Sequence, residues 1–244
     1  MKVTNLTDAE FGSIITEIDL ESLSSEESHD ILSLWNERAL LIFPEAFLSK
    51  QGQDDFAQIF GNLEFPRTAI SNLGKNGIIH QEPDDDVVKV IRGNEGWHHD
   101  STYMPVQALG AVFTADIVPD EGGLTGWADM RAAYNALDLY TQEKIDTLSA
   151  FHSYYYSQGR DGYLPDNQND DGTYNAYGFH DGEACLRPLV KVHPVTNLPN
   201  LLIGRHAHNV TGMEESESEE FMDGLNDFAC NESRTYFHNW EEGD

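Results

Sequence analysis

Basic residues are scarce in this chain. Only 14 Lys and Arg residues stand against 43 Asp and Glu residues, which gives a formal net charge of −29. A negative field of this strength repels nucleic acid and anionic membranes, so we expect neither among the partners of the protein. Self-repulsion also destabilises the compact state at low salt, where charges are poorly screened. We therefore hypothesise that the protein comes from a salt-adapted source.

The chain also has few cysteines and no long apolar run. Cys185 and Cys230 lie far apart and lack the spacing of a metal site, so we expect two reduced thiols. No stretch approaches the length of a membrane-spanning helix. The first residues, Met1 to Asp8, carry no apolar core of a signal peptide. Together these features predict a cytoplasmic protein.

The apolar residues that are present suffice for one core. Hydrophobic residues make up 39% of the 244 positions and aromatic residues 11%, which is typical of a globular protein. We expect a single domain over residues 1–244. Apolar periodicity and capping residues predict helices over 26–39, over 129–137 with Asp129 as N-cap, from Thr141 to about 148, and from Glu214 onward. Apolar runs predict strands over 40–43, 87–91 and 108–118.

The pair His98-x-Asp100 is the strongest chemical signal in the sequence. On an extended strand, residues two apart share a face, so both side chains could reach one metal ion, whereas His99 would face the other way. One His and one carboxylate are two-thirds of the facial triad that suits non-haem Fe(II). Isolated His-x-Asp pairs also occur by chance in many proteins, so the neighbouring sequence must decide.

A long polar segment over residues 157–183 is rich in Gly, Asn and Asp. Long loops of this kind are either lids over active sites or disordered inserts. Several aromatic residues lie in or just before it, and they could line a substrate pocket or pack against the base of the loop. They are Tyr154, Tyr155, Tyr156, Tyr163, Tyr174, Tyr177 and Phe179.

Several motifs appear together, in an order that resembles one family. They are Phe11-Gly12-Ser13-Ile14, Trp97-His98-His99-Asp100, Gly122-Gly123-Leu124-Thr125, Arg187-Pro188-Leu189-Val190 and Ile203-Gly204-Arg205-His206. The chain resembles the TauD/TfdA family, the taurine and 2,4-dichlorophenoxyacetate dioxygenases, over nearly its whole length. The resemblance implies a mainly β fold with flanking helices (α+β), a double-stranded β-helix or jelly-roll of the clavaminate synthase type. It also implies Fe(II), 2-oxoglutarate and O2 as cofactor and co-substrates.

The same resemblance implies the activity and the roles of five residues. The reaction would hydroxylate a small organic substrate, anionic in the best-known relatives, and release succinate and CO2. His98 and Asp100 would bind Fe(II), and the Thr125 hydroxyl would bind the distal carboxylate of 2-oxoglutarate. Asn94 and His206 match substrate-contacting positions, although a turn asparagine and a structural histidine are the alternatives. We expect a small-molecule substrate and leave open a homo-oligomer.

In the family, a segment like residues 236–244 continues into a strand reading Trp-Asp-Asn-Arg, a third His ligand and an arginine that pairs with 2-oxoglutarate. None of these elements is found in the sequence, so we expect a C-terminally incomplete jelly-roll that lacks the last core strands. The chain could be a fragment, an inactive paralogue, or a rewired site that uses His206 or His208. A pseudo-oxygenase that binds ligand without turnover, and a metal enzyme independent of 2-oxoglutarate, are the competing hypotheses.

Overall fold

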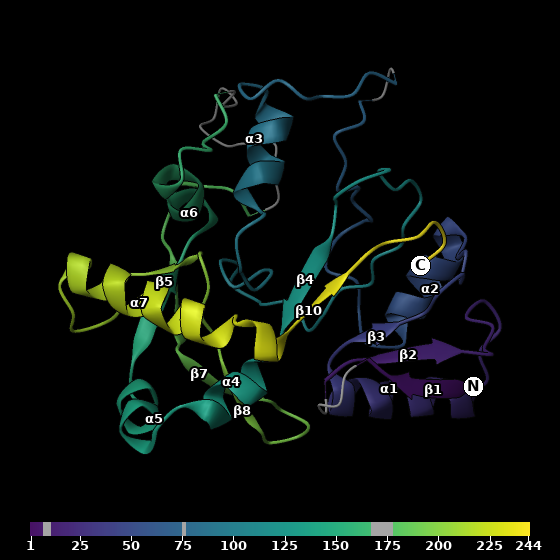
Figure 1. Ribbon diagram of the computed structural model, residues 1–244, viewed down its shortest axis with the longest axis horizontal. Coiled ribbons are helices and arrows are strands. Elements are labelled where there is room, and N and C mark those ends of the chain that lie inside the picture. Colours follow the sequence, from purple (N-terminus) through teal and green to yellow (C-terminus); the bar gives the residue numbers. More distant parts are fainter. Residues whose placement is uncertain (7–10, 75–76, 167–177) are drawn as a thin grey trace.

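The structure is a computed structural model that describes residues 1–6, 11–74, 77–166 and 178–244 (Figure 1). A three-stranded sheet opens the chain, in the order β1-β2-β3. Its strands are β1 (Lys2–Asn5), β2 (Ser13–Thr16) and β3 (Leu41–Ile42). Helix α1 (Ser25–Arg38) connects the parallel pair β2 and β3, and α2 (Lys50–Gln58) follows. Leu20, Ile31 and Phe56 form the core of this part.

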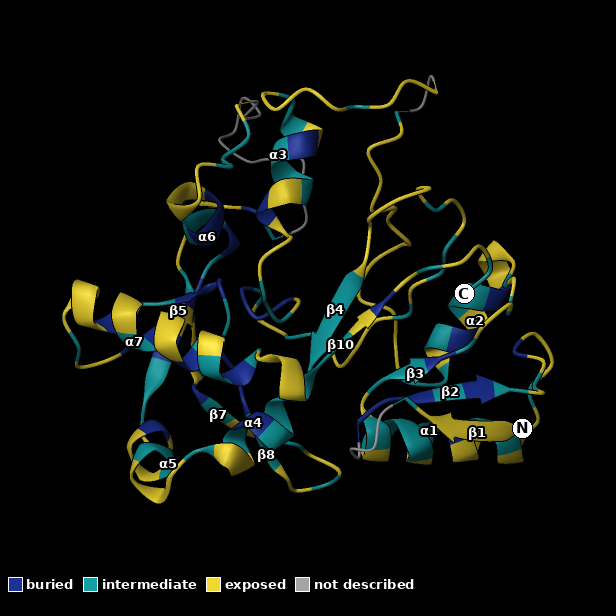
Figure 2. Ribbon diagram, viewed as in Figure 1, coloured by how far each residue is buried: buried dark blue, intermediate teal, exposed yellow. Residues whose placement is uncertain are grey.

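The larger core surrounds β5 (Ser149–His152), the central strand of a second three-stranded sheet. Strand β5 pairs antiparallel with both of its neighbours, β6 (Cys185–Pro188) and β9 (Ala207–His208). A two-stranded sheet of β7 (Val190–Val192) and β8 (Pro199–Leu201) lies nearby. Three helices contribute buried apolar side chains to this core: α4 (Met130–Ala136), α5 (Leu139–Ile145) and α7 (Glu215–Ala229). Figure 2 shows buried residues concentrated in this region.

The remaining elements lie between and above these two cores (Figure 1). Helix α3 (Asp86–Gly93) packs against α6 (Tyr154–Arg160). Strand β4 (Thr125–Ala128) pairs antiparallel with β10 (Thr235–His238), which follows the short 3₁₀ helix η1 (Glu232–Arg234). In the described ranges, no helix is long and apolar enough to cross a membrane.

Local capping signals correctly predicted two helices. The Ser24 side chain accepts a hydrogen bond from the Glu27 backbone N–H, and the Glu27 carboxylate accepts from the Ser24 N–H, so α1 begins with a complete capping box. The Asp129 carboxylate likewise caps α4. The prediction of Thr141 as the next N-cap was wrong. Asp138 caps α5 instead and accepts hydrogen bonds from both the N–H and the hydroxyl of Thr141.

Two of the predicted strands were wrong. Residues 87–91 lie within helix α3, because the Asp85 carboxylate accepts a hydrogen bond from the Val87 N–H and starts a helix there. Residues 108–118 have irregular backbone rather than a buried strand, and Leu109 and Ile117 are 61% and 72% exposed. Short apolar runs cannot be assigned from periodicity alone.

The aromatic residues at the base of the 157–183 segment pack against one another. Phe179 is buried and contacts Tyr154 edge to face, and Tyr154 stacks on Tyr103. Tyr174 and Tyr177 lie outside the described residues. For the described aromatics, the contacts therefore favour packing at the base of the loop.

Candidate metal centre

His98 and Asp100 lie in the irregular segment that follows α3, so the prediction that a strand carries them was wrong. Their donor atoms nevertheless converge. The Nε2 atom of His98 lies 3.2 Å from the Oδ1 atom of Asp100. Turn geometry thus brings the two side chains to one point without the shared strand face that the spacing had suggested.

This spacing fits two adjacent positions of one metal ion. Nitrogen and oxygen ligands bind divalent metals at about 2.1 Å, so two ligands at right angles lie about 3 Å apart. The second ring nitrogen of His98, Nδ1, lies 2.7 Å from the carbonyl oxygen of Gly96 and donates its hydrogen there. That bond fixes the orientation of the ring, as an outer-shell partner of a metal ligand does, and directs Nε2 at Asp100, where a metal ion would replace the proton that Nε2 shares with the carboxylate.

The electrostatics of the pair favour an ionised Asp100. Burial opposes a charge on His98, but its hydrogen bonds to Asp100 and to the Gly96 carbonyl outweigh burial and raise the pKa of His98. The hydrogen bond from His98 lowers the pKa of the Asp100 carboxyl. Asp100 therefore carries the negative charge that a divalent cation attracts.

His99 lies between these two residues in the sequence and lines the same cavity as His98. Burial lowers its pKa to about 4, and a backbone hydrogen bond connects its ring to Leu201. The Nε2 atom of His99 is buried and has no hydrogen-bond partner in the described part of the chain. His99 is therefore a neutral, half-buried histidine.

Over residues 1–6, 11–74, 77–166 and 178–244, no group of three or more His, Cys, Asp or Glu side chains could hold a metal ion. His208, one of the two substitute ligands considered from the sequence, stacks on Tyr156 with ring centroids 4.0 Å apart. The described residues thus fit two of the three protein ligands of a facial triad.

His206 lies beside His98, and its position is fixed by a hydrogen bond to Ser157. Its ring centroid is 5.2 Å from that of His98, and the residue is 2% exposed. The Ser157 hydroxyl donates to the Tyr154 carbonyl, so it accepts a hydrogen bond from Nδ1 of His206 at 2.8 Å. Burial lowers the pKa of His206 well below its ordinary value, which leaves a neutral ring with its lone pair on Nε2.

Gly204 lies against the backbone of Trp97 and His98. These residues belong to the candidate metal-ligand segment, residues 96–100, which carries His98 and Asp100. The Gly204 backbone has φ +116°, and a Cβ atom there would lie 2.9 Å from Cα of His98 and 3.0 Å from the Trp97 carbonyl oxygen. Both the conformation and the close approach require glycine. Gly204 thus lets two segments distant in sequence meet directly behind His98.

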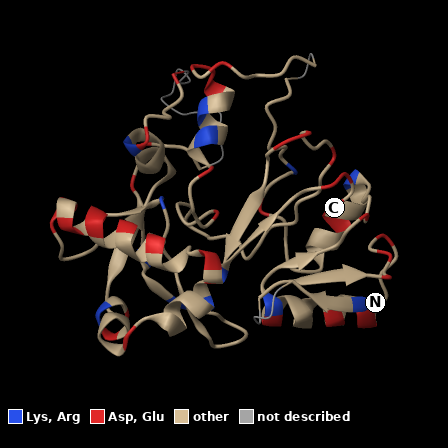
Figure 3. Cartoon of the chain, viewed as in Figure 1, with Lys and Arg blue, Asp and Glu red and all other residues tan. Residues whose placement is uncertain are grey.

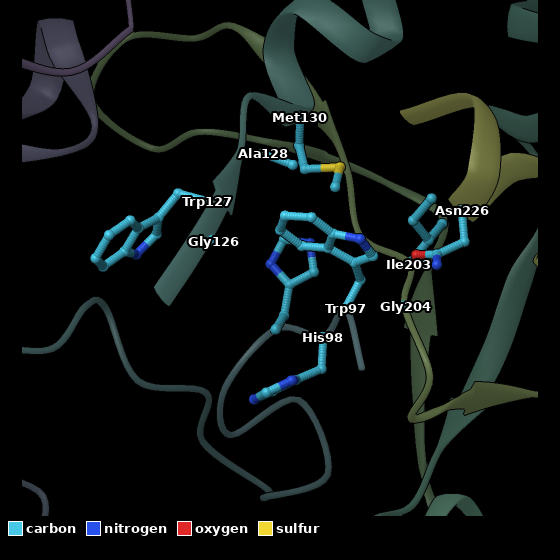
Figure 4. A pocket seen from close by; sticks show the side chains of 10 residues that line it. Trp97, His98, Gly126, Trp127, Ala128, Met130, Ile203, Gly204 and Asn226 are labelled. Carbon is cyan, nitrogen blue, oxygen red and sulfur yellow. The ribbon is translucent and has the colours of Figure 1, made fainter. Parts of the chain in front are cut away.

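Thr125 lies on β4, next to Gly126, which lines a cavity of about 160 Å³ with Trp97, His98 and Met130 (Figure 4). In this view the ring of His98 points away from the Trp97 indole. The Thr125 hydroxyl accepts a hydrogen bond from the indole N–H of Trp240 at 2.8 Å. Its own hydrogen remains available for a carboxylate.

Asn94 is the C-cap of α3 and is exposed. Its side-chain amide donates a hydrogen bond of 2.8 Å to the Tyr154 hydroxyl, which connects α3 to α6. The five residues selected from the sequence therefore fall into three places. His98, Asp100 and His206 lie together, Asn94 lies at the end of α3, and Thr125 lies on β4.

Sequence reasoning missed Gly204, Ser157 and Arg205. Arg205 is 6% exposed and donates its backbone N–H to the Trp97 carbonyl at 2.9 Å. In the sequence, residues 203–206 stand out only as part of the family resemblance. No local pattern shows that they support the metal-ligand segment, because that contact joins residues more than 100 positions apart.

Comparison with known proteins identifies the chain. The family described as "Taurine catabolism dioxygenase TauD, TfdA family" matches residues 2–244. An (S)-phenoxypropionate/alpha-ketoglutarate-dioxygenase from Sphingobium herbicidovorans is 50% identical over 97% of this chain and 82% of that protein. A protein of the same name from Delftia acidovorans is 46% identical over 98% of this chain and 83% of that protein.

A solved structure extends the likeness to the fold. The crystal structure of AAD-2 in complex with Mn(II) and N-oxalylglycine matches with a TM-score of 0.86 at 29% identity, over 99% of this chain and 86% of that chain. The expected jelly-roll fold with flanking helices is thereby confirmed. The chain belongs to the taurine catabolism dioxygenase TauD, TfdA family and is an Fe(II)- and 2-oxoglutarate-dependent dioxygenase.

Proposed function

We propose that the chain hydroxylates a small aryloxyalkanoic acid of the 2-phenoxypropionate type. The observation that carries the proposal is the convergence of His98 Nε2 and Asp100 Oδ1 at 3.2 Å, which provides two adjacent metal ligands. The substrate class is supported by the two relatives named for (S)-phenoxypropionate, at 50% and 46% identity over almost the whole chain.

In this proposal each predicted site residue has a defined task. His98 and Asp100 hold Fe(II), with the Gly96 carbonyl orienting the His98 ring. The Thr125 hydroxyl donates to the distal carboxylate of 2-oxoglutarate while it accepts from Trp240. His206 lies next to His98 and contacts the substrate from there. Asn94, at the end of α3, supports the substrate site through its hydrogen bond to Tyr154.

When bound, iron with 2-oxoglutarate and O2 supplies the oxidant, and the co-substrate leaves as succinate and CO2. Hydroxylation of the carbon that carries both the ether oxygen and the carboxylate gives a hemiketal. This product breaks its C–O bond to release a phenol and a 2-oxo acid. The protein contributes placement of the substrate carbon and exclusion of water.

The decisive experiment supplies the 244-residue chain with Fe(II), ascorbate, 2-oxoglutarate and (S)-2-phenoxypropionate under air. We expect phenol and succinate in equal amounts, measured by chromatography, and neither product with His98→Ala. Taurine serves as the matched substrate control, since it offers a sulfonate and no ether carbon. Phenol absent from a folded, metal-loaded chain would contradict the proposal. Succinate formed with taurine but not with the ether would redirect the substrate class.

We further propose that the protein works in a reducing cytoplasm. Both cysteines are free and partly buried, in agreement with reducing conditions. Recovery of both thiols in reduced form from intact cells of the source, by rapid alkylation, is the expected result.

A further inference from the structure

Arg205 is a buried cation directly beneath the segment that carries the metal ligands. Its backbone N–H donates to the Trp97 carbonyl, and its side-chain stem passes under Gly96, where a Cβ atom would lie 3.0 Å from Cδ of Arg205. The side chain of Arg205 is 4% exposed. The backbone and the stem of Arg205 thus both contact the residues just before His98.

The guanidinium of Arg205 points to helix α6. Its Nη2 atom donates to the Ser157 carbonyl at 2.9 Å and to Oδ2 of Asp161 at 2.5 Å. Charge-assisted bonds of this kind are stronger and more directional than neutral ones. One planar group therefore fixes the distance between the metal-ligand segment and the C-terminal turn of α6.

Helix α6 also holds the other side of the same segment. The Gln158 side chain packs over Gly93, where a Cβ atom would overlap its amide, and its Nε2 donates to the Val90 carbonyl at 3.4 Å. Tyr154 accepts from Asn94. Residues 90–94 thus contact α6 directly, through Gln158 and Tyr154. Gly96 and Trp97 are connected to α6 through Arg205.

Core stability alone does not explain this arrangement. Burying a guanidinium is costly, and Nη1 of Arg205 is buried without a hydrogen-bond partner among the described residues. An apolar side chain of similar length would fill the space at lower cost. What a guanidinium adds is a fixed geometry between a carbonyl, a carboxylate and the peptide beneath His98.

We propose that Arg205 is a positioning residue for the metal centre, which through Asp161 and Ser157 fixes helix α6 to the His98–Asp100 segment. The proposal rests on the proposed function for the assignment of His98 and Asp100 as ligands. It deepens that function, because it makes the metal affinity depend on a residue that does not touch the metal.

The test compares Arg205→Met with Arg160→Met. Arg160 pairs with the same carboxylate, Nε to Oδ1 of Asp161 at 3.1 Å, and also with Asp223. Removing Arg160 therefore removes a cationic partner of Asp161 without removing the contact to the metal-ligand segment. Both variants are examined without metal by hydrogen exchange of peptides covering residues 94–104, and with Mn(II) by calorimetry. Circular dichroism confirms that each is folded.

We expect Arg205→Met to speed exchange in residues 94–104 about tenfold and to weaken Mn(II) binding by roughly 10- to 100-fold, as loss of an outer-shell partner does. Arg160→Met should leave both within about twofold. Unchanged exchange in a folded Arg205→Met, or equal loosening in Arg160→Met, would overturn the proposal. Because exchange is measured without metal, a wild-type chain that fails to bind Mn(II) refutes the ligand assignment and leaves the positioning result readable.

Asp161→Asn covers the case in which Arg205→Met does not fold. That variant keeps the Arg205 stem and its bond to the Ser157 carbonyl but weakens the charge-assisted bond. Faster exchange in residues 94–104 supports the proposal, and exchange at the wild-type rate overturns it.

Discussion

The Nε2 atom of His98 lies 3.2 Å from Oδ1 of Asp100 in a segment without regular secondary structure. Two donors at that distance fit adjacent positions around one divalent ion. The convergence of the two donors depends on the conformation of the backbone from Gly96 to Asp100. A hydrogen bond between the His98 ring and the Gly96 carbonyl stabilises this conformation, as does the close packing of Gly204 against His98. These contacts hold the two side chains in the arrangement from which we expect metal binding.

Replacing either donor should abolish tight metal binding. We expect His98→Ala and Asp100→Ala each to weaken Mn(II) binding more than about 100-fold, a larger loss than that caused by changes in outer-shell partners. His29→Ala is the matched control, since His29 is an exposed histidine on α1. Calorimetric titration of the three variants decides. An Mn(II) affinity within twofold of wild type for His98→Ala would remove it from the ligand set.

Gly204→Ala should displace the metal-ligand segment. A Cβ atom at Gly204 would press on Cα of His98, whereas at Gly212, also with positive φ at +83°, nothing lies within 4 Å. Both alanine variants carry the cost of the left-handed backbone, roughly 1 kcal/mol. Only Gly204→Ala should also lose metal affinity, by about tenfold or more. Thermal unfolding and Mn(II) titration separate the two effects, and equal affinities in both variants would contradict the close-contact argument.

Removing the Thr125 hydroxyl should weaken 2-oxoglutarate binding. Thr125→Val keeps the shape of the side chain but leaves the Trp240 indole N–H without its acceptor, at a cost to folding of about 1 kcal/mol. We expect the KM for 2-oxoglutarate to rise about tenfold, and Thr125→Ser to restore it. If Thr125→Val keeps the wild-type KM, the hydroxyl serves Trp240 alone and the assignment from the family is wrong for this chain.

Local chemistry made some of the fold predictable. Helix α1 follows from the Ser24 and Glu27 capping box, a signal contained within four residues. Helix α3 was mistaken for a strand because its β-branched valines and isoleucine favour extended structure. The Asp85 cap and the packing of Gly93 under Gln158 decide for the helix, and the second of these is a tertiary contact.

The candidate site divides in the same way. The types and spacing of His98 and Asp100 predicted a shared metal ion, and their donors do converge, although on irregular backbone instead of a strand. Gly204 and Arg205 could not be inferred, because their roles depend on contact with residues 96–98 across the chain. The sequence therefore predicted which side chains could bind a metal ion, but it did not predict which distant residues pack against them.

The Cys230 thiol should react slowly at ordinary pH. Burial raises its pKa to about 11, so only about one molecule in a thousand carries the reactive thiolate at pH 8. In the variant Cys185→Ser, where Cys230 is the sole cysteine, we expect alkylation by iodoacetamide roughly 10²-fold slower than for a small free thiol. The rate should rise steeply up to about pH 11 and become ordinary in urea. Fast labelling of the folded variant at pH 8 would show that the thiol is neither buried nor shifted.

The last prediction concerns the excess of acidic residues, which is most visible along α7 (Figure 3). Glu217 and Glu220 are exposed on that helix one turn apart, where like charges repel. With a net charge of −29, the midpoint of urea unfolding should be higher in about 1 M KCl, where the Debye length is about 3 Å, than in about 0.01 M KCl, where it is about 30 Å.

The double variant Glu217→Gln with Glu220→Gln should unfold at higher urea than wild type in dilute buffer and at nearly the same urea in 1 M KCl. That pattern separates charge screening from a general effect of salt on apolar burial, which would shift both proteins equally. A wild-type midpoint that is the same at both salt concentrations refutes salt adaptation, because repulsion on this scale must then already be balanced within the fold.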